Sequence, residues 1–435
     1  MDTASQQILL VLEHLVKSVP TGTNLALLQL MWAMLTGHFL PSRGAVHTAL
    51  HLTGFKPSAV RRSWRALRYG VWSADELLSR WQAWVAKETH WQPRTVAGWQ
   101  AVAYDITTFW RPKLQKWQLR GFHQLAGRLL PGVVLGVVVR VGQIEEQRLP
   151  LLHKLLPAPA DATDEEALKQ RLFVYAQRTL GKAEVAIFDG GFKLKAMQAA
   201  NVPRFVVRQA TNCVFRRNFL PQREQNQGRP AEYGAPVRPL ARVYDGKQIE
   251  ATPPDEIVTF VHEGLTITAH HWTALVRSDQ KVDATHQTVD VWVYYDPRFT
   301  TPLVVATNLS LKAFIPFALY LDRWPVEQVP LAAKQMLGLH RMFVHAMVTV
   351  WRLPQLALLM GNVLTIMAAV LPRYLRGIGT DTPKNESGRL RRVLQPADFS
   401  KLTLCEARIR KKAAVTAHLP HGNPQHTGSK ALIEP

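Results

Sequence analysis

Four side chains that could act together, Tyr320, Arg323, Glu327 and Lys334, follow one another at steps of three, four and seven residues. On a helix, these steps all return to the same face. A carboxylate among cations suits a divalent metal that also meets a polyanion, because the carboxylate binds the metal while Arg and Lys bind phosphates. The alternative is a solvated helix face whose Arg and Glu form an ion pair at i, i+4.

Two prolines interrupt this segment. Pro325 fits a helix that begins near Trp324, because proline is tolerated in a first helical turn. Pro330 lies between Glu327 and Lys334 and lacks the amide that an intact helix needs there, so we expect a kink. The position of Lys334 on the common face depends on that kink.

Two aspartates end apolar, strand-like runs. Residues 98–108 include Asp105, and residues 184–189 end on Asp189. Parallel strands present ligand groups at their carboxyl ends, and an aspartate in a buried strand is costly unless it is hydrogen-bonded or binds a metal. Each aspartate could instead cap a helix or hold a turn, and Asp189 before Gly190-Gly191 fits that alternative well.

The pattern Tyr-x2-Arg-x3-Glu-x6-Lys, continued through residues 334–339, resembles the signature of cut-and-paste DDE transposases of the insertion-sequence-four type. The segments around Asp105 and around Asp189 (residues 187–192) resemble those around the two catalytic aspartates of that family. The similarity covers about residues 99–339. It implies a ribonuclease-H-like catalytic core that is interrupted by an inserted β subdomain before the glutamate helix.

The resemblance also implies roles for these residues. Asp105, Asp189 and Glu327 would be the catalytic metal ligands, holding two Mg²⁺ or Mn²⁺ ions roughly 3.5–4 Å apart. The phosphate-binding residues would be Tyr320, Arg323 and Lys334. The expected activity is cleavage at transposon ends and strand transfer into target DNA, within a complex that holds a homodimer on DNA.

Composition favours a polyanionic partner, because the 435-residue chain carries a formal charge of +21. That partner could be nucleic acid or an anionic membrane surface. Residues 21–40 and 353–372 are uncharged, yet both contain polar residues, so we expect buried helices and no membrane association. Asp2 and Glu13 stand where a secretory signal would be basic, and the chain has only two cysteines. We therefore expect a cytoplasmic protein that associates with nucleoid DNA.

The N-terminal region, residues 1–92, is predicted to be all helical and to bind DNA. A helix over 42–52, a turn over 53–57 and a second helix capped by Ser58 indicate a helix-turn-helix within 42–70. The alternative is a basic surface helix in an ordinary bundle. The candidate DNA-end-binding residues on the second helix are Arg61, Arg62, Arg65 and Arg68.

The remaining chain reads as an α/β protein in four parts. Strands and helices over 93–213 and the segment 311–376 would form the core, and 214–310 would be the β insert. Within the insert, Trp272 and Trp292 could stack on a displaced base, although core packing is the alternative. Residues 377–435 form a basic tail, predicted to be disordered after about residue 417.

These observations predict a DNA transposase that binds terminal inverted repeats and target DNA. Two rival hypotheses remain open. One is a catalytically inactive DNA-binding regulator derived from a transposase, which the kink at Pro330 favours. The other is a metal-dependent, structure-specific nuclease that performs no strand transfer.

Overall fold

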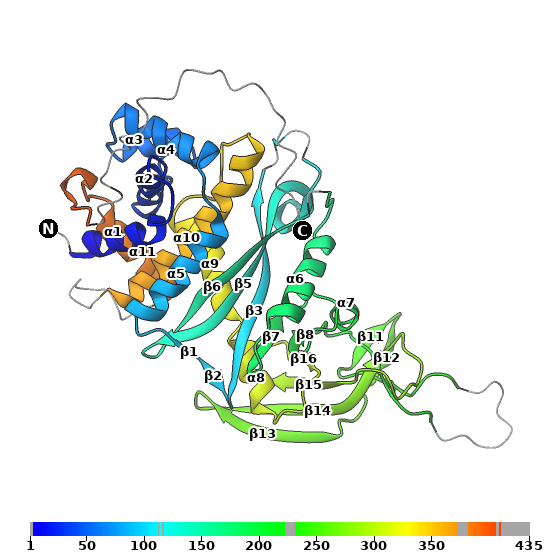
Figure 1. The fold of residues 1–435 in the computed structure, drawn as a ribbon. Helices are drawn as coiled ribbons and strands as arrows, with labels where there is room; N and C mark the ends of the chain where they lie inside the picture. Colours follow the sequence, from blue (N-terminus) through cyan, green and yellow to red (C-terminus); the bar gives the residue numbers. More distant parts are fainter. Residues whose placement is uncertain are drawn as a thin grey trace.

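The computed structural model describes residues 3–111, 113–114, 117–159, 161–221, 231–371, 382–405 and 409. The predicted disorder after about residue 417 lies outside these ranges. Within them the chain is a mixed α/β protein built on one large mixed sheet, with a helical block on one side (Figure 1).

The helical block contains the N-terminal helices and two later ones. Ser73 caps the fifth helix by accepting a hydrogen bond from the Glu76 amide at 3.1 Å. The block comprises α1 (Thr3–Val16), α2 (Asn24–Leu35), α3 (Val46–Leu52), α4 (Pro57–Tyr69), α5 (Ala74–Glu88), α10 (Met347–Val370) and α11 (Pro383–Leu394).

The helix pair expected around residues 42–70 is present with different starts. Gly44 has a positive φ of +86° and approaches the backbone of Arg341, so α3 begins only at Val46. Helix α4 begins at Pro57, in the first-turn position that proline prefers, and Lys56 precedes it. The prediction that Ser58 caps this helix is therefore wrong.

The core of the sheet has the order β6-β5-β3-β7-β8, with β3 antiparallel to β5 and parallel to β7. The sequence analysis did not identify β6. Helices α6 (Glu166–Thr179) and α7 (Leu194–Ala199) lie on the side of the sheet away from the helical block (Figure 1). The strands are β3 (Trp99–Trp110), β5 (Arg128–Ile144), β6 (Gln147–Pro157), β7 (Glu184–Phe188) and β8 (Phe205–Arg208), with the short β1 (Gln92–Pro93), β2 (Thr95–Val96) and β4 (Arg120–His123).

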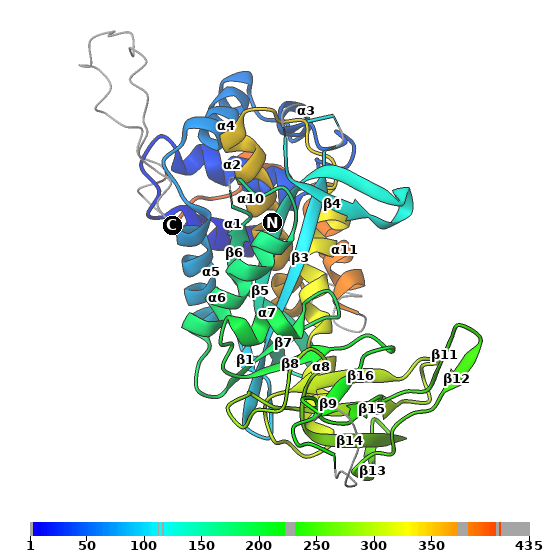
Figure 2. The same ribbon diagram turned by 90° about the vertical axis from the view of Figure 1, so that its right-hand side faces the viewer.

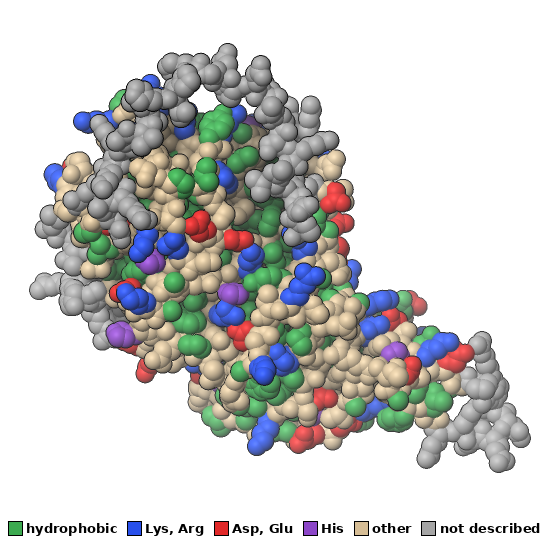
Figure 3. Space-filling model, viewed as in Figure 1, with side chains coloured by type: hydrophobic (Ala, Val, Ile, Leu, Met, Phe, Trp, Pro, Cys, Tyr) green, Lys and Arg blue, Asp and Glu red, His purple; other side chains and the backbone are tan. Residues whose placement is uncertain are grey.

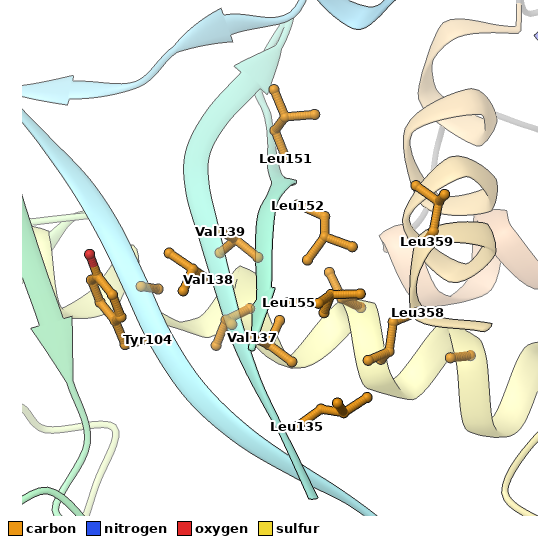
Figure 4. Packing of buried hydrophobic residues seen from close by; sticks show 14 of the residues in the cluster. Tyr104, Leu135, Val137, Val138, Val139, Leu151, Leu152, Leu155, Leu358 and Leu359 are labelled. Atoms are coloured by element: carbon orange, nitrogen blue, oxygen red, sulfur yellow. The ribbon is translucent and has the colours of Figure 1, made fainter. Parts of the chain in front are cut away.

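The contact between sheet and helical block combines apolar packing with buried hydrogen bonds, since Asn362 of α10 accepts from the Leu152 amide and donates to the Pro150 carbonyl. Leu152 and Leu155 of β6 lie between the sheet and Leu358 and Leu359 of α10, and all four are at most 4% exposed (Figure 4). Helix α10 is long and apolar enough to cross a membrane, but 83% of its most apolar window is buried inside the protein. The prediction of a buried helix is confirmed here, and also for α2.

Residues 214–310 add strands to the same sheet. Strand β16 pairs antiparallel with β8, so the insert continues the core sheet in the order β16-β15-β14-β9-β10. The sequence predicts strands over 256–262, 289–295 and 303–307, and these match β13, β15 and β16. Strands that it predicts separately over 265–269 and 274–276 form one bulged strand, and the strand that it predicts over 237–244 is wrong, because this segment holds the last residue of β10 and the whole of β11. The strands are β9 (Phe215–Arg217), β10 (Pro236–Val237), β11 (Arg242–Tyr244), β12 (Lys247–Ile249), β13 (Glu256–His262), β14 (Leu265–Arg277), β15 (Val289–Tyr295) and β16 (Leu303–Thr307).

The signature segment is not one regular helix. It contains α8 (Phe314–Leu321), the 3-10 turn η2 (Trp324–Glu327), the short α9 (Gln328–Leu331) and the π-helical η3 (Ala332–Met336). Pro325 lies in the first turn of η2, as expected. After Pro330 the helix widens, and the Leu337 amide donates to the Ala332 carbonyl at 3.0 Å, a π-type bond.

Candidate active site

Parallel pairing brings Asp105 and Asp189 to the same level of the sheet. Ala103 of β3 pairs with Ile187 of β7, and the two aspartates lie two residues further along their chains. Asp189 also accepts a hydrogen bond from the Gly191 amide at 2.9 Å, so it holds the turn as well as facing the site. The two aspartates are therefore neighbours, as expected, but the prediction that the strand of Asp105 ends there is wrong, because β3 continues to Trp110 and only β7 ends at this level.

Electrostatics link Glu327 to the two aspartates. Burial first, and then the negative charges of Asp189 and Glu327, raise the pKa of the Asp105 carboxyl to about 6, against the opposing effects of the Ile106 amide and Arg323. Negative charge is thus crowded around the middle of β3, where β7 ends. A cation would relieve that crowding.

In this structure an arginine supplies part of that positive charge. Arg323 Nη2 lies 2.9 Å from Glu327 Oε1, and its charge acts on Asp105 and Asp189 as well. Arg323 is 8% exposed, and its buried Nε atom has no hydrogen-bond partner. No three His, Cys, Asp or Glu side chains in the described ranges already form a metal-binding group. The Arg–Glu ion pair of the alternative interpretation is therefore present, and Glu327 would have to leave Arg323 to bind a metal.

Lys334 reaches the site despite Pro330. Its Nζ donates to Thr107 Oγ1 at 2.7 Å and lies 5.1 Å from the centre of the Phe109 ring. Burial lowers the pKa of Lys334 to about 8, and Asp105 opposes that shift. Tyr320 is buried, with its ring 5.8 Å from the Arg323 guanidinium carbon. All four signature side chains therefore lie near the second half of β3, from Asp105 onward.

A buried ion pair fixes the turn that carries Arg323 and Glu327. Asp322, only 1% exposed, accepts hydrogen bonds from Arg94 Nε at 3.0 and 3.1 Å, and Arg148 approaches to 3.7 Å. Asp322 points away from the signature face. It anchors the end of α8 to Arg94, which lies between β1 and β2, and to Arg148 of β6.

The sequence analysis missed Arg208. Phe188 pairs with Val207, so Arg208 lies level with Asp189 on the neighbouring parallel strand, and its side chain is exposed. It lines a cavity of about 290 Å³ together with Tyr320, Arg323, Trp324 and Phe299. The sequence predicts a strand over 204–208, and the place of Arg208 as its last residue was the available signal.

Other predicted residues lie elsewhere. All four arginines of α4 (Arg61, Arg62, Arg65 and Arg68) are exposed on the helical block, and Lys and Arg side chains are spread over the visible face of the molecule (Figure 3). Trp272 and Trp292 are 0% and 1% exposed, and Trp292 stacks on His271 with ring centres 3.6 Å apart. Their burial favours the core alternative over base stacking.

Comparisons with known proteins add little. No protein-family model matches the sequence, and no curated protein matches it. The chain is similar to a solved piggyBac transposase synaptic complex with hairpin DNA, with 8% identity and a TM-score of 0.38 over 91% of this chain and 74% of that chain. Similarity at that level does not establish the fold or the activity of this chain.

Proposed function

We propose that this chain is a DNA transposase that cleaves the ends of a mobile element and joins them to target DNA. The observation that carries the proposal is that Asp105 and Asp189 lie level on neighbouring strands, and that the charge of Glu327 also acts on Asp105. The mixed strand order β6-β5-β3-β7-β8 is compatible with the ribonuclease-H-like core that the resemblance implies.

The donor set fits Mg²⁺ or Mn²⁺. Carboxylate oxygens are the preferred ligands of these ions, and the raised pKa of Asp105 reflects its burial and, after that, nearby negative charge that a cation would neutralise. Two ions would be held by Asp105, Asp189 and Glu327, and would supply positive charge at the attacking and leaving oxygens of phosphoryl transfer. The release of Glu327 from Arg323 would complete the ligand set.

The chain's own cations would bind the DNA backbone beside the carboxylates. Released from Glu327, the buried Arg323 guanidinium can donate to a phosphate through two parallel hydrogen bonds. Lys334, whose pKa is about 8, stays positive at neutral pH and can contact a second phosphate oxygen. The Tyr320 hydroxyl would orient the same group. These residues therefore bind and orient, and the carboxylates carry the reaction.

DNA is the proposed partner outside the site as well. The exposed arginines of α4 present a basic helix face, and the formal charge of +21 favours a polyanion. We assign terminal inverted repeats to this helical region and target DNA to the carboxylate site. A homodimer on DNA and a cytoplasmic, nucleoid-associated location are parts of the same proposal.

A strand-transfer assay tests the proposal. The substrate is a pre-cleaved duplex of the element's own flanking sequence with a free 3′-hydroxyl, mixed with supercoiled plasmid and Mg²⁺ or Mn²⁺. Plasmid joined to the duplex is the expected product. Glu327→Gln should abolish joining and still bind the end, because it removes the charge and keeps the shape. Wild-type joining by that variant would contradict the site assignment.

One specific observation favours the inactive regulator as a second candidate: the Arg323–Glu327 ion pair occupies the third carboxylate. End binding without cleavage or joining in either metal would support it. Cleavage without joining would instead support the structure-specific nuclease.

A further inference from the structure

A basic hairpin with an apolar outer face projects from the sheet. Strand β4 pairs with the start of β5, placing Phe122 opposite Leu129, and the short 3-10 turn Gln124–Ala126 closes the tip (Figure 2). Phe122 and Leu129 are 58% and 56% exposed, and Leu125 at the tip is 96% exposed. Large apolar side chains gathered at an exposed tip indicate an interaction site.

The hairpin is held firmly by its other face. The His123 ring lies 4.9 Å from the Trp110 ring, and a Cβ on Gly121 would meet Trp110 at 3.1 Å. Trp117 Nε1 donates to the Gly132 carbonyl at 2.7 Å at the base of the hairpin. Strand alternation then turns Phe122 and Leu129 away from the body. The outward face is therefore fixed in its orientation.

The charge of the hairpin indicates what kind of molecule it binds. No acidic residue occurs between Asp105 and Glu145, Glu165 lies against Gly121 on the inner face of the hairpin, and the exposed cations Arg120 and Arg128 flank the apolar tip. A two-fold contact between two copies of this chain would bring these like charges together. Duplex DNA matches both features, because it is a polyanion with an apolar interior. Apolar side chains beside arginines insert between its base steps and kink the duplex.

The strand that carries the hairpin also relates it to the carboxylates. On β5, Val137 lies opposite Asp105, and Leu129 lies opposite Phe122. Val137 and Leu129 are eight residues apart. That separation is about 26 Å along the strand. It corresponds to roughly eight base pairs of a duplex that follows β5.

We propose that Phe122, Leu125 and Leu129 form a wedge that unstacks a base step of duplex DNA about eight base pairs from the phosphate at the carboxylates. This inference rests on the proposed function, because it needs DNA at the site. The wedge holds the duplex bent, and the flanking arginines bind the phosphates on either side of the opened step.

The test uses the full chain and duplexes of the element's end sequence, each with one 2-aminopurine at a successive position on both sides of the expected step. Wild type should raise the fluorescence at one or two neighbouring positions. The combined variant Phe122→Ala, Leu125→Ala, Leu129→Ala should lose that rise and bind about tenfold more weakly. The matched control, Val243→Ala with Tyr244→Ala on the exposed β11–β12 hairpin, should behave as wild type.

Because the three wedge residues are exposed, the variant should unfold at the same temperature as wild type. An unchanged fluorescence rise in the variant would overturn the inference. So would a change in oligomeric state without a change in fluorescence, which would mean that the tip contacts protein. Cleavage by wild type with no fluorescence rise at any position would overturn the wedge and leave the proposed function standing, whereas failure to bind the duplex would overturn both.

Discussion

Asp105→Asn should stabilise the metal-free protein while abolishing its activity. Burial and two like charges raise the pKa of Asp105 from 3.8 to about 6, so the fold favours the neutral form. That difference corresponds to about 3 kcal/mol at pH values above 6. Asn is neutral and keeps the oxygen that accepts from the Ile106 amide. The attraction to Arg323 is already contained in that pKa, so we expect a net gain of about 3 kcal/mol at pH 7.5.

The sign of the pH dependence follows from linkage. A carboxyl whose pKa is raised in the fold adds stability that is fully present below pH 3.8 and is lost as pH rises through about 6. The wild type therefore gains stability relative to Asp105→Asn as pH falls from 7.5 towards 4. The gap between the two proteins should close over that range.

Urea unfolding in EDTA, followed by tryptophan fluorescence at a series of pH values, measures this gap. Asp296→Asn is the matched control: hydrogen bonds from Arg298 lower the pKa of Asp296, so its neutralisation should destabilise the protein at pH 7.5. Added Mg²⁺ should stabilise wild type and not Asp105→Asn. If Asp105→Asn is less stable than wild type in EDTA at pH 7.5, the reasoning from charge crowding is wrong.

Three further predictions concern the supports of the site and the DNA contacts. Arg94→Ala leaves the buried Asp322 carboxylate without its main partner and should cost about 3 kcal/mol in urea unfolding, and a loss below about 0.5 kcal/mol would contradict this. Gly361→Ala would place a Cβ 2.8 Å from the Ala333 amide nitrogen, so we expect a loss of about 1–3 kcal/mol, with unchanged stability as the contrary result. Arg62→Ala and Arg65→Ala should each weaken end binding and reduce its logarithmic salt slope by about 0.9, and unchanged slopes would move the DNA-binding face elsewhere.

Local patterns predicted much of the sheet. Strands β13, β15 and β16 agree residue for residue with the sequence-based ranges, because β-branched and aromatic residues lie between clear turns. Strand β6 was missed because its leucine-rich run between Pro150 and Pro157 contains no β-branched residue. Pairing with β5, a tertiary contact, makes it a strand. The β-propensity of the individual residues does not predict such a contact.

The site divides in the same way. Asp189 could be placed at a strand end, whereas β3 continues past Asp105 to Trp110, and the common level of the two aspartates depends on the β3–β7 register, which only the folded sheet fixes. The reach of Lys334 depends on the π turn after Pro330. Arg208 belongs to the site because it lies beside Asp189 on the neighbouring strand. Local sequence therefore predicted most residue types at the site, and long-range pairing determined how they meet.

The most direct test of the central claim is cleavage of DNA that carries the element's own flanking ends, by wild type and Asp189→Ala, in Mg²⁺, Mn²⁺ or EDTA. The proposal predicts nicking at the ends that requires the metal and disappears in the variant. End binding without cleavage in either metal, or cleavage that survives Asp189→Ala, would contradict a carboxylate site that cuts DNA.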